Sequence, residues 1–162
     1  MFYKILFHLA AAIKSVIFKS IYGGRFHIGK NVTWRKRFNV MIAKGAEVKI
    51  GNQCFLNNDC SINANNNISI GEGCLFGENV KIYDHNHRFA NPDLTIKEQG
   101  FSDGTVIIGN NCWIGSNVVI LKDSWIEDNC VIGAGVIVSG HIKNNTLLKC
   151  NNNYCAEEIR FR

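Results

Sequence analysis

The sequence predicts an all-β solenoid, a triangular prism of stacked coils with one helix at its N-terminal end and one loop projecting from its side. Aliphatic or aromatic residues recur at every sixth position along most of the chain, and Gly, Asn and Asp recur between them. This count breaks once at length, between Ile82 and Ile108. Neither an α-helix nor an amphipathic strand has a period of six, so a repeat architecture is indicated.

The six-residue repeat defines the coils. Three sixes make one coil, with a short strand on each side of the prism and a turn at each corner. Asn, Asp and Gly suit the corners because they tolerate left-handed backbone angles. The residues predicted to point inward, and to stack on their equivalents in the next coil, are Ile28, Trp34, Ile50, Leu56, Ile62, Ile70, Phe76, Ile82, Ile108, Ile114, Ile120, Ile126, Ile132 and Val138.

Length and charge limit the remaining choices. The 162 residues suffice for one domain with a buried core. We expect an N-terminal helix over residues 1–24, the repeat domain over 25–149 with its loop at 84–105, and a C-terminal tail over 150–162. The net charge of +5 fits an anionic ligand or a solvated surface equally well, and we expect no nucleic-acid partner.

Five of the seven cysteines follow the repeat, and this spacing does not indicate a disulfide pattern. These five sit four residues after an inward aliphatic residue, in a slot that calls for a small apolar side chain. We therefore expect free, reduced thiols in the core, as in a cytoplasmic protein. A zinc site is not expected, because the chain has no Cys-x-x-Cys pair. The five are Cys54, Cys60, Cys74, Cys112 and Cys130, whereas Cys150 and Cys155 lie outside the repeat and have no assigned role.

The N-terminal segment has apolar residues at helical spacing, and Gly23 and Gly24 can end the helix. Two interpretations remain open. The helix packs on the open end of the prism and hides a sheet edge, or residues 1–21 form a basic interfacial helix that contacts the inner face of a membrane. The lysines argue against a membrane span. The apolar set is Phe2, Ile5, Leu6, Leu9, Ile13, Val16, Ile17 and Ile21; Lys4, His8, Ser15 and Lys19 gather on the other side, with Phe7 and Phe18 among them.

The fragments "IGNNCWIGSNVVI" and "VIGAGVIV" carry an aliphatic residue, then Gly, two variable residues and a small residue. This pattern resembles the hexapeptide-repeat, left-handed parallel β-helix family over roughly residues 28–142. The resemblance implies acyl transfer from acetyl-CoA to a hydroxyl or amine, with a loop histidine as general base. It also implies a homotrimer that closes its sites between subunits.

The interruption "IYDHNHRFANPDLT" holds the candidate catalytic residues. Imidazole titrates near neutral pH, so it can remove the proton of an attacking hydroxyl. Counting without gaps from "IGEGCLFGENVKI" places His87 on the catalytic histidine of the galactoside and maltose acetyltransferases. The stretch "NHRF" is also similar to an Asn-His-Arg stretch of xenobiotic acetyltransferases. A loop difference of one residue would transfer the role to His85, and Asp84 or Glu98 could orient the imidazole.

The same resemblance implies further site residues. Asn57 and Asp84 are assigned to the acceptor, Trp113 to acceptor and coenzyme together, and Ser116, Ala134 and Ser139 to the coenzyme. The chain has "VSGHIKNN" where relatives often carry Thr-Lys-Asp, so the lysine that would hold the coenzyme phosphate is missing. Lys143 is our replacement for it in the coenzyme site, with Lys149, Arg160 and Arg162 as further candidates.

These observations predict an O-acetyltransferase that uses acetyl-CoA on a sugar hydroxyl, in surface polysaccharide or glycolipid synthesis. Acetylation of an antibiotic is the alternative within the same class. A carbonic-anhydrase-like metal enzyme would need three histidine ligands across a subunit boundary, and the third has no candidate; we therefore predict no metal site. A non-catalytic scaffold would leave His85 and His87 dispensable.

Overall fold

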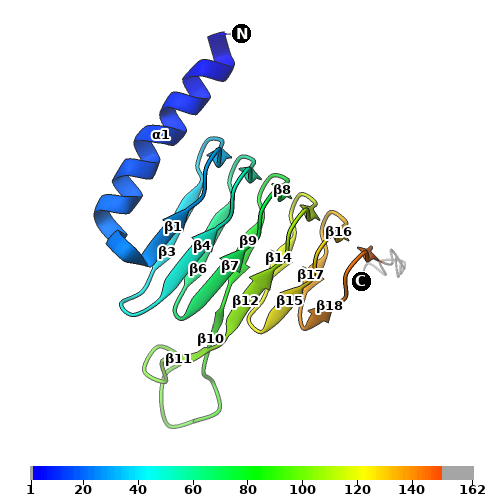
Figure 1. Cartoon of the computed structure of the whole chain (residues 1–162). Coiled ribbons are helices and arrows are strands. Elements are labelled where there is room, and N and C mark those ends of the chain that lie inside the picture. Colours follow the sequence, from blue (N-terminus) through cyan, green and yellow to red (C-terminus); the bar gives the residue numbers. More distant parts are fainter. Residues whose placement is uncertain (1, 151–162) are drawn as a thin grey trace, which may run out of the picture.

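The computed structural model describes the backbone of residues 2–150 and the side chains of Leu9 and residues 11–150. Residues 25–150 form a left-handed parallel β-helix of three sheets around one core (Figure 1). The predicted tail, with Cys155, Arg160 and Arg162, lies outside the described residues apart from Cys150.

All strands within the three sheets pair in parallel. Sheet A contains β1 (Phe26–Ile28), β4 (Glu47–Ile50), β7 (Asn67–Ile70), β12 (Thr105–Ile108), β15 (Ser124–Ile126) and β18 (His141–Ile142). Sheet B contains β2 (Thr33–Trp34), β5 (Phe55–Leu56), β8 (Leu75–Phe76), β13 (Trp113–Ile114), β16 (Val131–Ile132) and β19 (Leu147–Leu148). Sheet C contains β3 (Asn39–Ile42), β6 (Ser61–Ala64), β9 (Lys81–Tyr83), β14 (Val119–Ile120) and β17 (Ile137–Val138).

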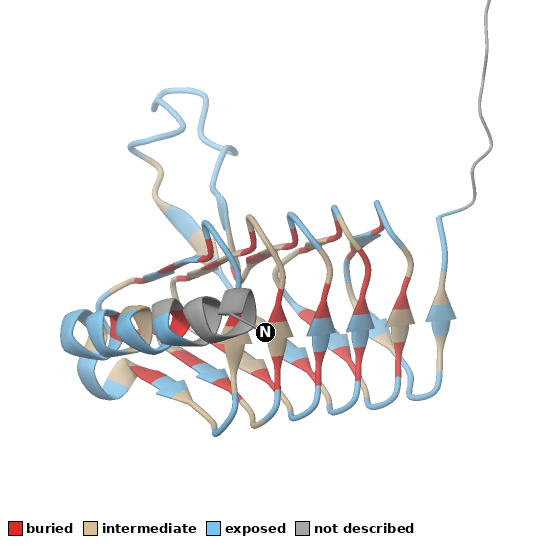
Figure 2. Cartoon of the chain, turned by 90° about the horizontal axis from the view of Figure 1, so that it is seen from above, coloured by how far each residue is buried: buried red, intermediate tan, exposed pale blue. Residues whose placement is uncertain are grey.

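The core is built by the predicted inward residues. In sheet A, Ile50 pairs with Ile70, Ile70 with Ile108, and Ile108 with Ile126, so equivalent side chains stack along the prism axis. From Ile108 to Ile132 each sixth residue is no more than 1% exposed (Figure 2). Burial of these columns supplies the main stabilisation, since each strand is too short to be stable alone.

The corners use the backbone angles that the sequence predicted. Asn31, Asn79, Asn111, Asn117 and Asn129 all have positive φ, between 53° and 60°. Side chains also link successive coils at the corners: the amide oxygen of Asn110 accepts a hydrogen bond from the backbone N–H of Glu72 at 2.8 Å. These bonds satisfy polar groups that the turns would otherwise leave unpaired.

The five repeat cysteines are free and buried, as predicted. Each thiol donates a hydrogen bond to a carbonyl oxygen of the next coil; Cys60 Sγ lies 3.1 Å from the oxygen of Gly77, and Cys130 Sγ lies 3.1 Å from that of Lys143. Burial raises the pKa of the Cys60 and Cys130 thiols, because the charged thiolate loses its hydration there. The cysteines therefore serve as small core residues.

Helix α1 (Phe2–Tyr22) packs on the first coil and continues into a 3-10 turn, η1 (Gly23–Arg25) (Figure 1). The contact is made by the side of the helix that the sequence marked as polar. Phe18 is 6% exposed and packs edge-on against Phe26 and Phe38, at ring-centroid distances of 5.7 and 6.1 Å. No helix among residues 2–150 is long and apolar enough to cross a membrane.

Candidate active site

The projecting loop leaves the prism between β9 of sheet C and β12 of sheet A, at the corner that joins these two sheets. Its base is an antiparallel hairpin of β10 (His85–His87) and β11 (Phe101–Asp103), visible beside the prism in Figure 1. His85 pairs with Asp103 and His87 with Phe101. The hairpin therefore holds both candidate histidines outside the core, on a short ordered ribbon.

Asp84 anchors the start of this ribbon. It is fully buried, and its two carboxylate oxygens accept hydrogen bonds from the backbone N–H groups of Asn65 and Asn66, both at 2.8 Å. The oxygen that faces Asn65 also lies 3.0 Å from Nδ1 of His85. The Asp84 side chain is not exposed, so it cannot make the contact with the substrate that the sequence predicts for it. Its position suits orientation of the His85 ring.

His87 lies on the exposed part of the hairpin. Its ring packs against Phe101 at a centroid distance of 4.4 Å, while His85 meets the same ring edge-on at 5.1 Å. His87 lines a hollow of about 590 Å³, together with Asn86, Arg88, Phe89, Ala90, Asn91, Leu94, Gln99, Ser102 and Lys122. The hollow combines one imidazole, two cations and several amide and hydroxyl groups, a set that suits a polar acceptor.

Glu98 does not reach either imidazole. Its carboxylate accepts hydrogen bonds from the backbone N–H and the hydroxyl of Thr95, at 3.0 and 2.7 Å. The same bonds hold the pKa of Glu98 below its ordinary value. Glu98 therefore stabilises the loop turn, and Asp84 is the carboxylate that contacts a histidine.

A second hollow lies at the corner between sheets B and C. Its volume is about 510 Å³, and it gathers Trp113, Ser116 and Ala134, three residues assigned to the coenzyme. Its lining also includes Gly77, Gly115, Gly133, Val131, Ile132, Leu147, Lys149 and Cys150. Glycine backbone and apolar side chains make a narrow slot, and Lys149 adds a cation beside it. We call this hollow the corner groove.

Ser139 and Lys143 are not in the corner groove. Ser139 follows β17 at the corner between sheets C and A, which is the corner that bears the loop. Lys143 follows β18 at the corner between sheets A and B. The assigned coenzyme residues are thus divided among three corners, and Lys149 is the lysine that the structure places beside Trp113, Ser116 and Ala134.

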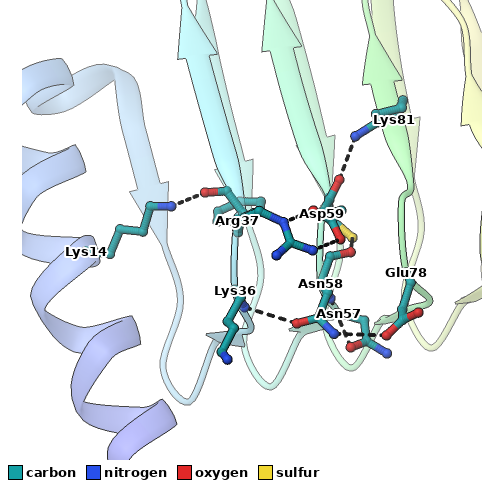
Figure 3. A network of polar contacts seen from close by, with 10 residues as sticks. Lys14, Lys36, Arg37, Asn57, Asn58, Asp59, Glu78 and Lys81 are labelled. Carbon is teal, nitrogen blue, oxygen red and sulfur yellow. Dashed lines mark hydrogen bonds and ion pairs between the residues drawn. The ribbon is translucent and has the colours of Figure 1, made fainter.

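Asn57 lies in the same corner column as the groove, towards the N-terminus. It aligns with Gly77 through the pairing of β5 with β8. Its side-chain oxygen accepts a bond from the N–H of Asn58 at 2.9 Å, and Asn58 in turn donates to Glu78 at 2.9 Å (Figure 3). Asn57 is therefore part of a polar corner network and is half-buried.

The two hollows do not meet within one protomer. The His87 hollow lies at the carboxyl edge of sheet C, and the corner groove lies at its amino edge. A short strand and its turns separate them, on the order of 15 Å. Among the described side chains, those of Leu9 and residues 11–150, no group of three His, Cys, Asp or Glu is arranged to hold a metal ion.

The sequence is similar to those of known proteins. The family model "Bacterial transferase hexapeptide (six repeats)" matches residues 105–140. Residues 105–140 therefore carry the hexapeptide repeat of this family. It is 34% identical to the galactoside O-acetyltransferase of Escherichia coli K12 over 108 residues, covering 67% of this chain and 52% of the relative. It is 31% identical over 88 residues to WbbJ of the same organism, whose name assigns it to lipopolysaccharide biosynthesis as an O-acetyl transferase; that match covers 50% of this chain and 45% of WbbJ.

Solved hexapeptide-repeat structures extend the match. A galactoside acetyltransferase in complex with coenzyme A superposes with a TM-score of 0.68 at 29% identity, covering 88% of this chain and 70% of the other. A maltose O-acetyltransferase from Clostridium difficile 630 gives the same TM-score and identity, over 88% and 75% of the two chains. The chain spans about half, or less, of the length of the curated relatives it matches.

Proposed function

We propose that this hexapeptide-repeat protein transfers an acetyl group from acetyl-CoA to a sugar hydroxyl, in surface polysaccharide or glycolipid synthesis. The observation that carries the proposal is the pair of hollows: one holds His87 among polar side chains, and the other gathers Trp113, Ser116 and Ala134 in a glycine-floored slot. Galactoside acetyltransferase bound to coenzyme A and the O-acetyl transferase WbbJ support both halves of the reaction.

The corner groove suits a long, thin acyl donor. Gly77 and Gly115 bring the backbone close to its floor, so exposed peptide groups can bond the amides of a pantetheine arm. Trp113 is 53% exposed and offers a flat apolar surface beside them. Lys149 can pair with a coenzyme phosphate. This set binds a donor along the prism edge without enclosing it.

His87 supplies the chemistry. Its imidazole removes the proton of the acceptor hydroxyl while that oxygen attacks the thioester carbonyl carbon. The new C–O bond forms, the C–S bond breaks, and the departing thiolate of coenzyme A takes the proton from the imidazolium. Backbone N–H groups hold the oxyanion in between. Transfer is direct, so we expect sequential kinetics without an acyl-enzyme.

The distance between the hollows calls for more than one chain. In a homotrimer, the loop of one protomer can reach the corner groove of its neighbour and bring His87 to the thioester. Ser139 fits this arrangement. It lies at the corner of the prism that bears the loop, so it would contact the donor from the side opposite the neighbour's corner groove. The reduced core cysteines are consistent with a cytoplasmic reaction.

The test measures release of free coenzyme A thiol from acetyl-CoA across a panel of sugars and glycans. We expect one acceptor class to accelerate release, with the acetyl group recovered as an ester. His87→Ala should abolish that acceleration, whereas His141→Ala, an exposed histidine bonded to Glu127 on sheet A, should not. Acceptor-dependent release that survives His87→Ala would remove His87 as the base, and failure of every hydroxyl acceptor would remove the proposed reaction.

A further inference from the structure

Helix α1 turns its apolar stripe away from the prism. Leu9, Ile13, Val16, Ile17 and Ile21 are between 49% and 69% exposed. At 100° per residue they occupy one continuous face of the helix. An ordinary surface helix presents its polar face to water and packs its apolar face on the protein. In α1 the aliphatic face is the exposed one.

This orientation of α1 is fixed by contacts on the opposite face. Phe18 and Ala11 are buried against the first coil, and Tyr22 Oη donates to the carbonyl of Val40 at 2.8 Å. Lys14 Nζ donates to the carbonyl of Phe38, and Ser15 Oγ bonds back to Ala11 at 2.9 Å. Rotating the stripe inward would break the contacts that Phe18, Lys14 and Tyr22 make with the first coil, whereas the Ser15 bond lies within the helix. The exposed stripe is thus fixed by the packing of the opposite face of the helix. Figure 2 shows most of the described helix in the colour of exposed residues.

The charge along the N-terminal part of the sequence is one-sided. Residues 1–46 hold nine of the chain's 18 lysines and arginines and none of its 13 acidic residues. Lys19 and Lys30 are exposed near the joint between α1 and the first coil, where Lys19 shares a hollow with Gly29 and Asn31. The nine are Lys4, Lys14, Lys19, Arg25, Lys30, Arg35, Lys36, Arg37 and Lys44.

An apolar stripe on a segment that carries lysines and arginines but no carboxylate of its own fits one kind of partner. The acyl-chain boundary of a bilayer takes up the apolar side chains, and anionic headgroups pair with the lysines beside them. A protein partner would have to be both apolar and acidic at matched positions. A second copy of this chain presents the same cations, which repel each other if the stripes pair face to face.

We propose that α1 docks the protein on an anionic lipid bilayer, lying in the interface with Leu9, Ile13, Val16, Ile17 and Ile21 inserted. The helix is roughly 31 Å long at the standard rise, so all five residues reach the surface together. A homotrimer would present three such helices and multiply a weak single contact. This inference is independent of the acyl-transfer proposal.

The experiment is co-sedimentation of the full chain with phosphatidylcholine vesicles, with and without phosphatidylglycerol. We expect binding to the anionic vesicles alone, weakened by salt. Ile13→Gln with Ile17→Gln should lower the affinity at least about tenfold, since two apolar side chains no longer enter the bilayer. Lys19→Gln and Lys30→Gln should each lower it about fivefold.

The matched control is Ile107→Gln, which replaces an isoleucine that is 42% exposed on sheet A and should leave vesicle binding unchanged. Equal binding to neutral and anionic vesicles, no binding by the wild-type chain, or unchanged binding of the Ile13 and Ile17 variant would overturn the proposal. A smaller assembly of that variant in analytical ultracentrifugation, without vesicle binding by the wild type, would identify a second copy as the occupant. If the double variant fails to fold, the two lysine variants decide.

Discussion

Buried Asp84 and partly exposed His85 form a carboxylate–imidazole pair at the root of the projecting loop, with 3.0 Å between Oδ1 and Nδ1. The side chain of His85 is 12% exposed, whereas His87, two residues along the same strand, is exposed on the His87 hollow. The two histidines therefore have different surroundings. His85 is positioned by the prism, and His87 is presented to a ligand.

The first prediction separates these roles. His87→Ala should lower turnover by roughly two to four orders of magnitude, the usual contribution of a positioned general base. Binding of acetyl-CoA should be nearly unchanged, because His87 meets the acceptor. His85→Ala should be milder, since it removes packing from Phe101 and leaves the base in place. An inactive His85→Ala beside an active His87→Ala would assign the base to His85 instead.

The second prediction concerns Asp84 as a positioning residue. Asp84→Ala removes the acceptor of two backbone N–H groups, those of Asn65 and Asn66, and leaves these part-buried groups without that partner. We expect a loss of about 2–4 kcal/mol in the free energy of unfolding, measured with urea. Asp103→Ala is the control, because Asp103 accepts from Asn65 at 3.3 Å in an exposed position. Equal losses for both variants would contradict a special role for Asp84.

The sequence predicted the prism well because one rule repeats. Every sixth residue must be apolar for the coils to stack, and this periodicity leaves a signal at Ile108, Ile114, Ile120, Ile126 and Ile132 that tertiary context does not override. The free core cysteines followed from the same phase. The sequence assigned Trp113, Ser116 and Ala134 to one ligand, and all three line one hollow, since they lie at fixed repeat positions around one corner.

Features outside the repeat were harder to predict. The apolar spacing of residues 9–21 identified a helix but not which face packs. Phe18, with Lys14 and Tyr22 beside it, contacts the first coil, and the aliphatic stripe does not. Glu98 and Asp84 were equal candidates to orient a histidine until the hairpin placed only Asp84 in contact. The surroundings of the two histidines depend on the pairing of β10 with β11. A single sequence does not reveal which strands pair.

The third prediction tests the packing of α1. Phe18→Ala should lower the free energy of unfolding by about 3–5 kcal/mol, because it opens a cavity among Phe26, Trp34 and Phe38. Val16→Ala, at a site that is 69% exposed, should have almost no effect. Urea unfolding measures both. A larger loss for Val16→Ala than for Phe18→Ala would mean that the stripe, and not Phe18, packs on the prism.

The fourth prediction concerns thiol reactivity. In the native protein at about pH 8, alkylation should modify Cys150, which is exposed, and should spare Cys54, Cys60, Cys74, Cys112 and Cys130. Burial excludes the reagent, and the raised pKa of Cys60 and Cys130 keeps these thiols neutral and unreactive. Peptide mass spectrometry identifies the modified sites. Rapid native labelling of any of the five would contradict the stacking of the coils.

The last prediction tests whether the site is shared between subunits. Ala134→Tyr should fill the corner groove and abolish activity without disturbing the core, because Ala134 is exposed on the groove wall. His87→Ala should be inactive through loss of the base. If each site joins the loop of one protomer to the groove of its neighbour, co-expression of the two variants produces mixed assemblies in which an intact His87 faces an intact groove. We therefore expect partial recovery of acetyl transfer in the mixture. A chain that carries both changes, co-expressed with His87→Ala, is the control and should stay inactive, since no intact His87 is present. If the first mixture also stays inactive while mass spectrometry shows mixed assemblies, base and groove must act within one chain, and the shared cleft is wrong.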